Sequence, residues 1–208
     1  MRPFIHVNCA MSADGKIAGT DRKQVRISSE EDKQRVKNLR RQYDAILVGV
    51  GTVVSDDPHL TVKGLSYDEN PVRIIIDPHG RTPDDAMVLN DSAPTVIITD
   101  DDCQRTWGNA DVIRCGTPLD LNLAMEELAK AGIESILVEG GGETIASFFK
   151  AKMVDRFSVF VGSMVIGGRS SPTPVDGDGW ISEKGIGLDL KSTEVLGNGV
   201  LLTYSPVF

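Results

Sequence analysis

A run of three glycines between acidic residues is the part of the sequence best suited to bind an anion. It reads Glu139-Gly140-Gly141-Gly142-Glu143-Thr144 and lies between the apolar run Ser135–Val138 and a helical pattern through Ile145, Phe148 and Phe149. Glycines let the backbone approach a ligand, and the free amides of a helix N-terminus suit a pyrophosphate. A tight turn that needs positive φ angles explains the run equally well. The usual Gly-x-Gly-x-x-Gly dinucleotide fingerprint is absent.

A second group of candidates follows the apolar run Ala45–Val50. Gly51 again permits a close approach, and the four-residue spacing of Thr52 and Asp56 places them on one side of a short helical turn. Lys63 is a candidate cation for a phosphate group. The alternative for Asp56 and Lys63 is an ordinary solvated surface position.

The first apolar run, Phe4–Met11, leads into the polar residues Ser12, Asp14 and Lys16, and Asp14-Gly15 is a strong turn signal. Ends of strands that gather at one edge of a sheet are where open α/β folds bind ligands. Several such segments together favour a ligand-binding cleft more than any one of them does.

Alternating strands and helices are expected to position these segments. The predicted strands are Phe4–Met11, Ala45–Val50, Val72–Asp77, Thr95–Thr99, Val112–Cys115 and Ser135–Glu139. Ser28-Ser29-Glu30-Glu31-Asp32 supplies a cap and an acidic first turn for one helix, and Asp120–Ala131 predicts a second helix that crosses over between parallel strands. The alternation favours a mostly parallel sheet with helices on both faces.

The last third of the chain has a different pattern. Val154–Val161 and Val200–Tyr204 have the character of strands, and a stretch rich in Gly, Ser and Pro over Gly167–Gly187 separates them. We predict an antiparallel ending on the parallel sheet, with a long surface loop, and a single domain over residues 1–208.

Composition excludes several classes of protein. The 208 residues carry a net charge of −8, which argues against a nucleic-acid surface of clustered Lys and Arg. No apolar run approaches the roughly 18 residues of a membrane span, and the N-terminus lacks a signal peptide, so we predict a cytoplasmic protein without a membrane partner. Cys9, Cys103 and Cys115 are widely spaced, and the three histidines are scattered, which predicts inert thiols and no metal site.

Several ordered motifs together resemble the reductase domain of riboflavin biosynthesis. They cover nearly the whole chain, and their order is that of this family: Met11-Ser12-Ala13-Asp14-Gly15-Lys16-Ile17-Ala18, Leu39-Arg40, Asp44-Ala45-Ile46-Leu47-Val48-Gly49, Gly51-Thr52-Val53, Asp56-Asp57-Pro58-His59-Leu60-Thr61-Val62, Pro71-Val72-Arg73-Ile74-Ile75-Ile76-Asp77 and Val138-Glu139-Gly140-Gly141-Gly142.

The resemblance implies a dihydrofolate-reductase-like fold, a homodimer, and reduction of a ribosylamino group to ribitylamino with NADPH. The chain is most similar to the archaeal and fungal type, which acts on 2,5-diamino-6-ribosylamino-4(3H)-pyrimidinone 5′-phosphate. Three alternatives stay open: a reductase of the deaminated uracil compound, dihydrofolate reductase itself, and a nucleotide-binding module without enzymatic activity.

The family pattern also implies roles for individual residues. It assigns NADPH contacts to Ala10, Thr52, Asp56, Asp77, Pro78, Gly141, Gly142, Glu143, Thr144, Ile145, Ala146 and Ser147. It assigns substrate contacts to Arg40, Leu60, Lys63 and Glu139.

Two carboxylates are candidates for managing protons while the ribose opens to an imine. Glu139 lies at a strand end, and Asp32 lies in the first turn of a helix, where a capping role is an equally good explanation. Arg81 follows the strand that ends at Asp77, and its guanidinium is a candidate partner for the 2′-phosphate of NADPH.

Overall fold

A computed structural model describes all residues, Met1 to Phe208, as two compact units. The first unit consists of Met1–Phe4 and Asn38–Val138, and the second of Ile5–Lys37 and Glu139–Phe208. None of the helices has the length and apolar character that crossing a bilayer requires.

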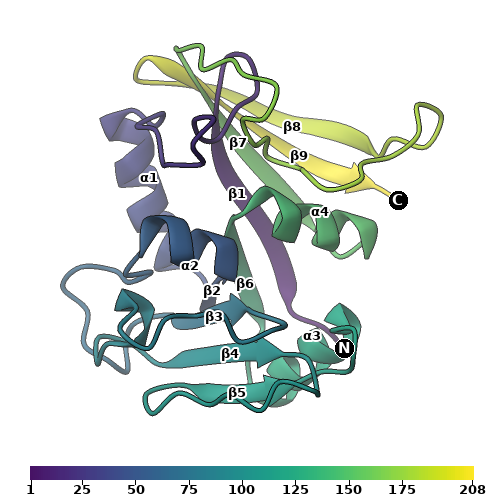
Figure 1. Cartoon of the computed structure of the whole chain (residues 1–208). Coiled ribbons are helices and arrows are strands. Elements are labelled where there is room, and N and C mark those ends of the chain that lie inside the picture. Colours follow the sequence, from purple (N-terminus) through teal and green to yellow (C-terminus); the bar gives the residue numbers. More distant parts are fainter. The chain divides into compact units, whose positions relative to one another are not determined.

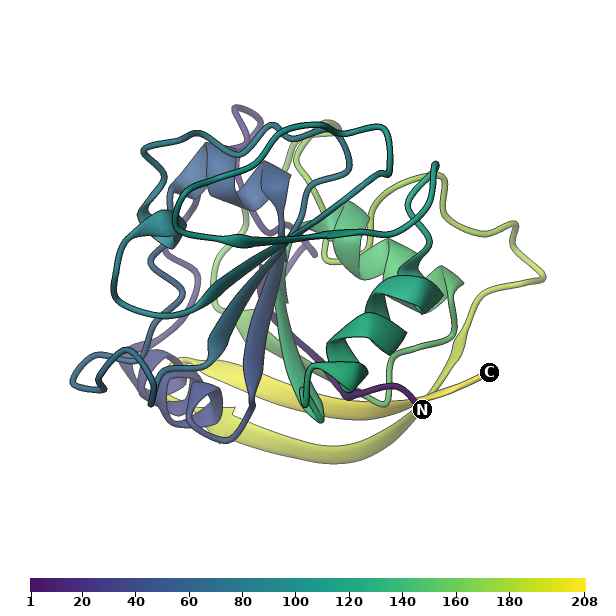
Figure 2. The same ribbon diagram turned by 90° about the horizontal axis from the view of Figure 1, so that it is seen from below.

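The first unit is built on parallel strands. Its elements are β2 (Ala45–Gly49), α2 (Val50–Asp56), β3 (Val72–Ile76), the 3-10 helix η1 (Met87–Leu89), β4 (Thr95–Thr99), β5 (Asp111–Arg114), α3 (Leu121–Lys130) and most of β6 (Ser135–Gly140). The strand order is β5-β4-β3-β2-β6, and the pairings from β2 to β5 are parallel. Figure 2 shows β2 to β5, coloured blue to teal, as a twisted fan.

Buried aliphatic side chains from three of these strands form the core of the first unit. The strands β2 and β3 are apolar over almost their whole length, as strands covered on both faces must be. The core cluster consists of Ile46, Val48, Val50, Val53, Leu60, Ile75, Ala86, Val88, Leu89, Ile97 and Trp107. Because α2 and the segment around η1 contribute side chains to this cluster, burial of those apolar side chains stabilises the packing of both segments against the sheet.

The second unit carries the antiparallel ending. It contains β1 (Phe4–Ser12) from Ile5 onward, α1 (Glu30–Arg40) as far as Lys37, α4 (Gly142–Lys150), β7 (Arg156–Gly162), β8 (Gly187–Leu196) and β9 (Gly199–Val207). β1 and β7 are parallel, whereas β9 pairs antiparallel with both β7 and β8. Figure 1 shows β8 and β9 as the yellow hairpin.

Helices cover both faces of the strands in the second unit. Asn8 is paired in register with Ser158, so the two side chains share a face, and Asn8 accepts a hydrogen bond from Arg35 of α1 at 2.8 Å. Phe157 points to the opposite face, where its ring meets that of Phe149 of α4 edge-on at 5.4 Å. The predicted arrangement of helices on both faces is therefore confirmed here.

Most predicted elements are confirmed, with shifts of one to three residues at their ends. Ser29 accepts the amide of Asp32 at 3.1 Å at the start of α1, and Asp120 caps α3 through the amides of Asn122 and Leu123. Val50 belongs to α2 rather than to the preceding strand, and β7 begins at Arg156. The sequence analysis did not predict β8, although Leu188 and Leu190 alternate with polar residues at its start; the strand is exposed along almost its whole length.

A buried polar chain crosses the strands of the second unit. His6 Nε2 lies 2.8 Å from Ser158 Oγ, which lies 3.3 Å from Thr203 Oγ1. Burial, aided by the positive charges of Arg156 and Arg35, lowers the pKa of His6 from 6.5 to about 3. His6 is therefore neutral in the folded chain at neutral pH.

This depressed pKa predicts acid destabilisation. Between about pH 6.5 and pH 3 the unfolded chain binds a proton at His6 that the folded chain excludes, so stability is complete above pH 6.5 and falls as the pH falls. The loss at pH 5 is about 2 kcal/mol. Urea unfolding of wild type and His6→Gln at pH 7 and pH 5 measures this loss. The free energy of unfolding should differ less between the two pH values in the variant than in wild type. The assignment of this pH dependence to His6 would be wrong if His6→Gln kept the wild-type pH dependence of the unfolding free energy and a variant of the exposed His59 lost it.

Candidate functional site

The glycine-rich turn lies in the second unit, where the end of β6 meets α4. Gly141 precedes the helix with φ 36°, a left-handed value that favours glycine, and as the N-cap residue it has no side chain with which to cap the first turn. Because glycine offers no side-chain acceptor, the first amides of the helix must be capped by other groups. A phosphate is one group that can accept their hydrogen bonds. The donor set therefore fits the pyrophosphate of a dinucleotide.

The exposure of α4 limits which of its atoms can meet a ligand. The side chains of Ile145 and Ala146 are buried, whereas Glu143 and Ser147 are exposed, and the Ser147 hydroxyl donates to the Glu143 carbonyl at 2.9 Å. The family-implied contacts of Ile145 and Ala146 would thus have to involve the main chain. Thr144 is half-buried.

Gly142 serves the packing of the chain itself. A Cβ atom at this position would overlap the carbonyl oxygen of Thr173 and lie 2.9 Å from Asp176 Oδ2. The Asp176 amide also donates to the Gly142 carbonyl at 3.1 Å. The absence of a side chain at Gly142 is therefore required by a later segment of the same chain, a reason that sequence reasoning did not consider.

In the first unit, α2 carries Thr52 and Asp56 on one helical turn, as their spacing predicts. Thr52 is half-buried and Asp56 is exposed, with the Ser55 hydroxyl donating to Asp56 at 2.9 Å. Asp57 ends the helix with φ 42°, and its carboxylate accepts the amide of Met87 at 2.7 Å. Both aspartates are exposed, but the Asp57 carboxylate is held by the Met87 amide, so Asp56 is the aspartate that lies on the same turn as Thr52.

The turn after β3 is organised by the carboxylate of Asp77. This buried group accepts the amides of Arg81 at 2.9 Å and Thr82 at 2.7 Å, and the Thr82 hydroxyl at 2.7 Å. Its hydrogen bonds are directed to its own turn, so a cofactor contact at Asp77 or Pro78 would be made by the main chain. The Arg81 side chain is exposed.

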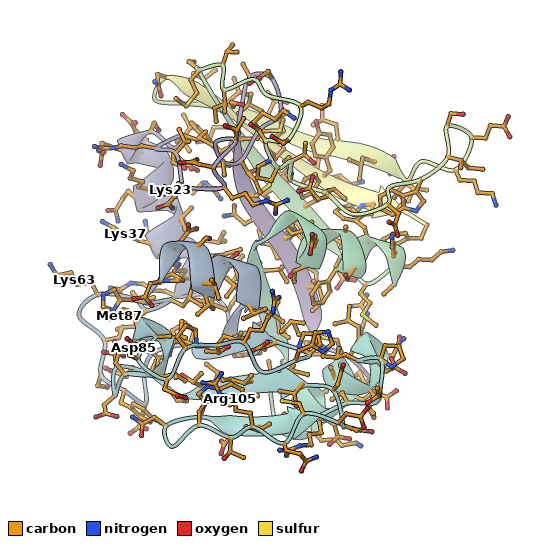
Figure 3. All side chains as sticks on the ribbon, viewed as in Figure 1. Lys23, Lys37, Lys63, Asp85, Met87 and Arg105 are labelled. Carbon is orange, nitrogen blue, oxygen red and sulfur yellow. The ribbon has the colours of Figure 1, made fainter.

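Three of the four predicted substrate residues lie in the first unit, and hydrogen bonding links two of their segments. Arg40 donates to the carbonyl of Thr61 at 3.2 Å, between Leu60 and Lys63. Leu60 has φ 48° and packs its side chain into the core, so its backbone is what remains for a ligand. Figure 3 shows Lys63 extending outward from its loop.

Comparison with known proteins identifies the family. The model of the RibD C-terminal domain matches residues 3–202. The chain belongs to the RibD C-terminal domain family.

Two archaeal relatives of this RibD C-terminal domain are named 2,5-diamino-6-ribosylamino-4(3H)-pyrimidinone 5′-phosphate reductase. The protein of Methanothermobacter thermautotrophicus is 41% identical, with 99% of each chain covered. The protein of Archaeoglobus fulgidus is 38% identical, with 98% of each chain covered.

A solved structure confirms the predicted dihydrofolate-reductase-like α/β fold. It is a diaminohydroxyphosphoribosylaminopyrimidine deaminase/5-amino-6-(5-phosphoribosylamino)uracil reductase of Thermotoga maritima, with a TM-score of 0.82 and 24% identity. The alignment covers 99% of the present chain and 57% of the Thermotoga chain, so the present chain spans little more than half of that protein.

In this RibD C-terminal domain, Asp32 has a structural partner. It is buried, its carboxylate lies 2.7 Å from the guanidinium of Arg35, and the same guanidinium donates to Asn8 of β1. The ion pair lies within α1, and the hydrogen bond from Arg35 to Asn8 joins this helix to β1. Glu139 is half-buried near the end of β6, and Ala10 is half-buried in β1.

Sequence reasoning missed two residues that organise the domain. Arg35 belongs to no recognisable sequence motif. Its role in linking α1 to β1 comes from the buried partners that folding brings to it, Asp32 and Asn8. Asp14 was recognised as part of a turn, but its carboxylate also accepts amides of Ile166 and Gly167 far along the chain. Only an alignment of homologues or the fold itself could reveal such contacts.

Proposed function

We propose that this chain reduces 2,5-diamino-6-ribosylamino-4(3H)-pyrimidinone 5′-phosphate to the ribitylamino compound with NADPH, as a step of riboflavin biosynthesis. The observation that carries the proposal is the identity of 41% and 38% with two archaeal reductases of that name, over almost the full length of each. A reductase of the uracil compound is the second candidate, and the name of the Thermotoga protein favours it.

The test is NADPH oxidation by the purified chain with the diaminopyrimidinone, the deaminated uracil and dihydrofolate in turn. We expect the highest kcat/KM with the diaminopyrimidinone. A higher value with the uracil compound would favour the second candidate. Oxidation with dihydrofolate alone, or with none of the three, would overturn the proposal.

The residues that the family pattern assigns to NADPH would hold the cofactor, whose nicotinamide ring supplies the hydride when bound. The start of α4, whose N-cap Gly141 has no side chain, suits its pyrophosphate, and the exposed side chains of Asp56 and Arg81 are accessible for polar contacts. The proposed set is Ala10, Thr52, Asp56, Asp77, Pro78, Arg81 and Gly141–Ser147.

The substrate needs groups that bind its phosphate and manage its protons. We assign Arg40 and Lys63 to the 5′-phosphate, because an acidic chain must place cations locally to attract an anion. Glu139 would bind ribose hydroxyls and move a proton as the ring opens. Asp32 remains a weaker candidate, since its carboxylate is already paired with Arg35.

Arg81 predicts a preference for NADPH over NADH. In Arg81→Ala we expect the Kd of NADPH to rise roughly tenfold, because one charged fork to the 2′-phosphate is lost. The Kd of NADH, which lacks this phosphate, should not change. Titration of cofactor fluorescence with both nucleotides measures the effect, and an unchanged Kd of NADPH would show that Arg81 is an ordinary surface charge.

Three further features stay proposals. We propose that residues 1–208 form a single reductase domain, that two copies associate as a homodimer, and that the protein acts in the cytoplasm. Light scattering on the purified chain would test the dimer.

A further inference from the structure

Residues 163–176, here called the strap, follow β7 and are held at two separate places. The first is the turn after β1. There the Ala13 amide donates to the Met164 carbonyl at 2.8 Å, and the Ile17 amide donates to the Pro172 carbonyl at 3.0 Å. In Figure 1 the strap is the green connection that passes the purple turn after β1.

Asp14 is the main side-chain anchor of the strap. Its Oδ1 accepts the Ile166 amide at 3.0 Å, and its Oδ2 accepts the Gly167 amide at 2.7 Å. The buried Ser12 hydroxyl orients the carboxylate with a 2.6 Å hydrogen bond. Together the Ser12 hydroxyl and these two amides lower the pKa of Asp14 to about 2, so the group is ionised at neutral pH.

The second place is the glycine-rich turn. The amide and the hydroxyl of Thr173 both donate to Asp176 Oδ1, at 3.0 and 2.6 Å, which closes a compact turn over Thr173–Asp176. This turn packs directly on Gly142, where a Cβ atom would overlap it, and it donates the Asp176 amide to the Gly142 carbonyl. The residues of the strap that contact the start of α4 are therefore different from Ile166 and Gly167, which Asp14 contacts.

We infer that the strap fixes the glycine-rich turn in the conformation that binds the cofactor, and that Asp14 is the positioning residue that holds the strap in place. The inference rests on the proposed function, in which this turn binds the pyrophosphate of NADPH. A rigid turn keeps its amides aimed at one point, whereas a released strap lets the turn sample conformations that bind phosphate poorly.

The test variant is Asp14→Asn, because the amide keeps the size of the side chain but can no longer accept from both Ile166 and Gly167. We expect the Kd of NADPH to rise about tenfold, on the scale of one lost charge-assisted hydrogen bond. The kcat at saturating NADPH should stay within about twofold, because Asp14 touches no reacting group. The control is Asp21→Asn, an exposed aspartate on the same segment whose carboxylate accepts the Lys23 amide.

A second readout does not depend on activity. Hydrogen exchange at the amides of Gly142–Ile145 should accelerate in Asp14→Asn and not in Asp21→Asn, because release of the strap exposes the turn. Thr173→Val removes the hydroxyl at the other end of the strap, so it should raise the Kd similarly. The double variant should then bind NADPH little more weakly than either single variant.

The outcomes separate the two hypotheses. An Asp14→Asn variant that melts earlier but keeps its Kd and its exchange rates would show a merely structural role and overturn the inference. Fully additive effects of Asp14→Asn and Thr173→Val would overturn it too. If the wild-type chain fails to bind NADPH, the proposed function fails, and the exchange rates alone still decide whether Asp14 orders the turn.

Discussion

The Glu139→Gln variant is expected to lose roughly 100-fold or more of the wild-type kcat, the usual scale for loss of a general acid–base group. The substitution keeps the size of the side chain and part of its hydrogen bonding, but it removes the charge and the ability to carry a proton. Glu139 lies in β6 beside the glycine-rich turn and is partly exposed. Steady-state kinetics with the diaminopyrimidinone measures the effect.

Two other outcomes for this variant have different meanings. If Glu139 only orients the ribose, KM should rise while kcat survives. If it only supports the turn, the melting temperature should fall while the kinetic constants stay near normal. Glu134→Gln, an exposed glutamate just before the same strand, is the matched control and should behave like wild type. Near-normal kinetics in a stable Glu139→Gln protein would remove Glu139 from the site.

The second large effect concerns stability. Arg73 is fully buried on the core face of β3, and its guanidinium donates to the carbonyls of Met87, Asn90 and Ala93 and to the Asn90 side chain. Burial lowers the pKa of Arg73 to about 10, so it remains charged at neutral pH. The side chain thereby ties the segment around η1 to the sheet.

We expect Arg73→Met to lose about 3 kcal/mol or more of the free energy of unfolding. Methionine fills most of the volume but leaves several buried oxygens without donors, each worth about 1–3 kcal/mol, and relief from burying the charge offsets only part of this. Urea denaturation measures the loss. Arg114→Met is the matched control, since Arg114 also donates to backbone carbonyls, but at an exposed position, and should cost under about 1 kcal/mol.

Equal stability of Arg73→Met and wild type would mean that the cost of burying this charge cancels its hydrogen bonds. The Arg73→Lys variant then separates charge from geometry. Lysine keeps the charge but lacks the planar fork, so it should recover only part of the stability if the array of four oxygens is what matters.

Local chemistry in the sequence was sufficient to predict most elements of the fold. The acidic turn after Ser29 and the cap at Asp120 specify helix starts through contacts within a few residues, and these were confirmed. Apolar runs such as Val72–Asp77 predicted buried strands, because a strand that is covered on both faces has a nearly continuous hydrophobic pattern. The ordered motifs also predicted the family, which the family model confirmed.

Tertiary structure alone decided which roles these residues are free to play. Asp77 was predicted as a cofactor residue, yet its carboxylate is directed to its own turn. Position 142 must be glycine because a Cβ atom there would overlap the carbonyl oxygen of Thr173. The Asp14 carboxylate accepts two amides of the strap. These partners are distant in sequence, and no local pattern encodes them. A hydrogen bond or a packing contact between distant residues exists only once the chain has brought them together.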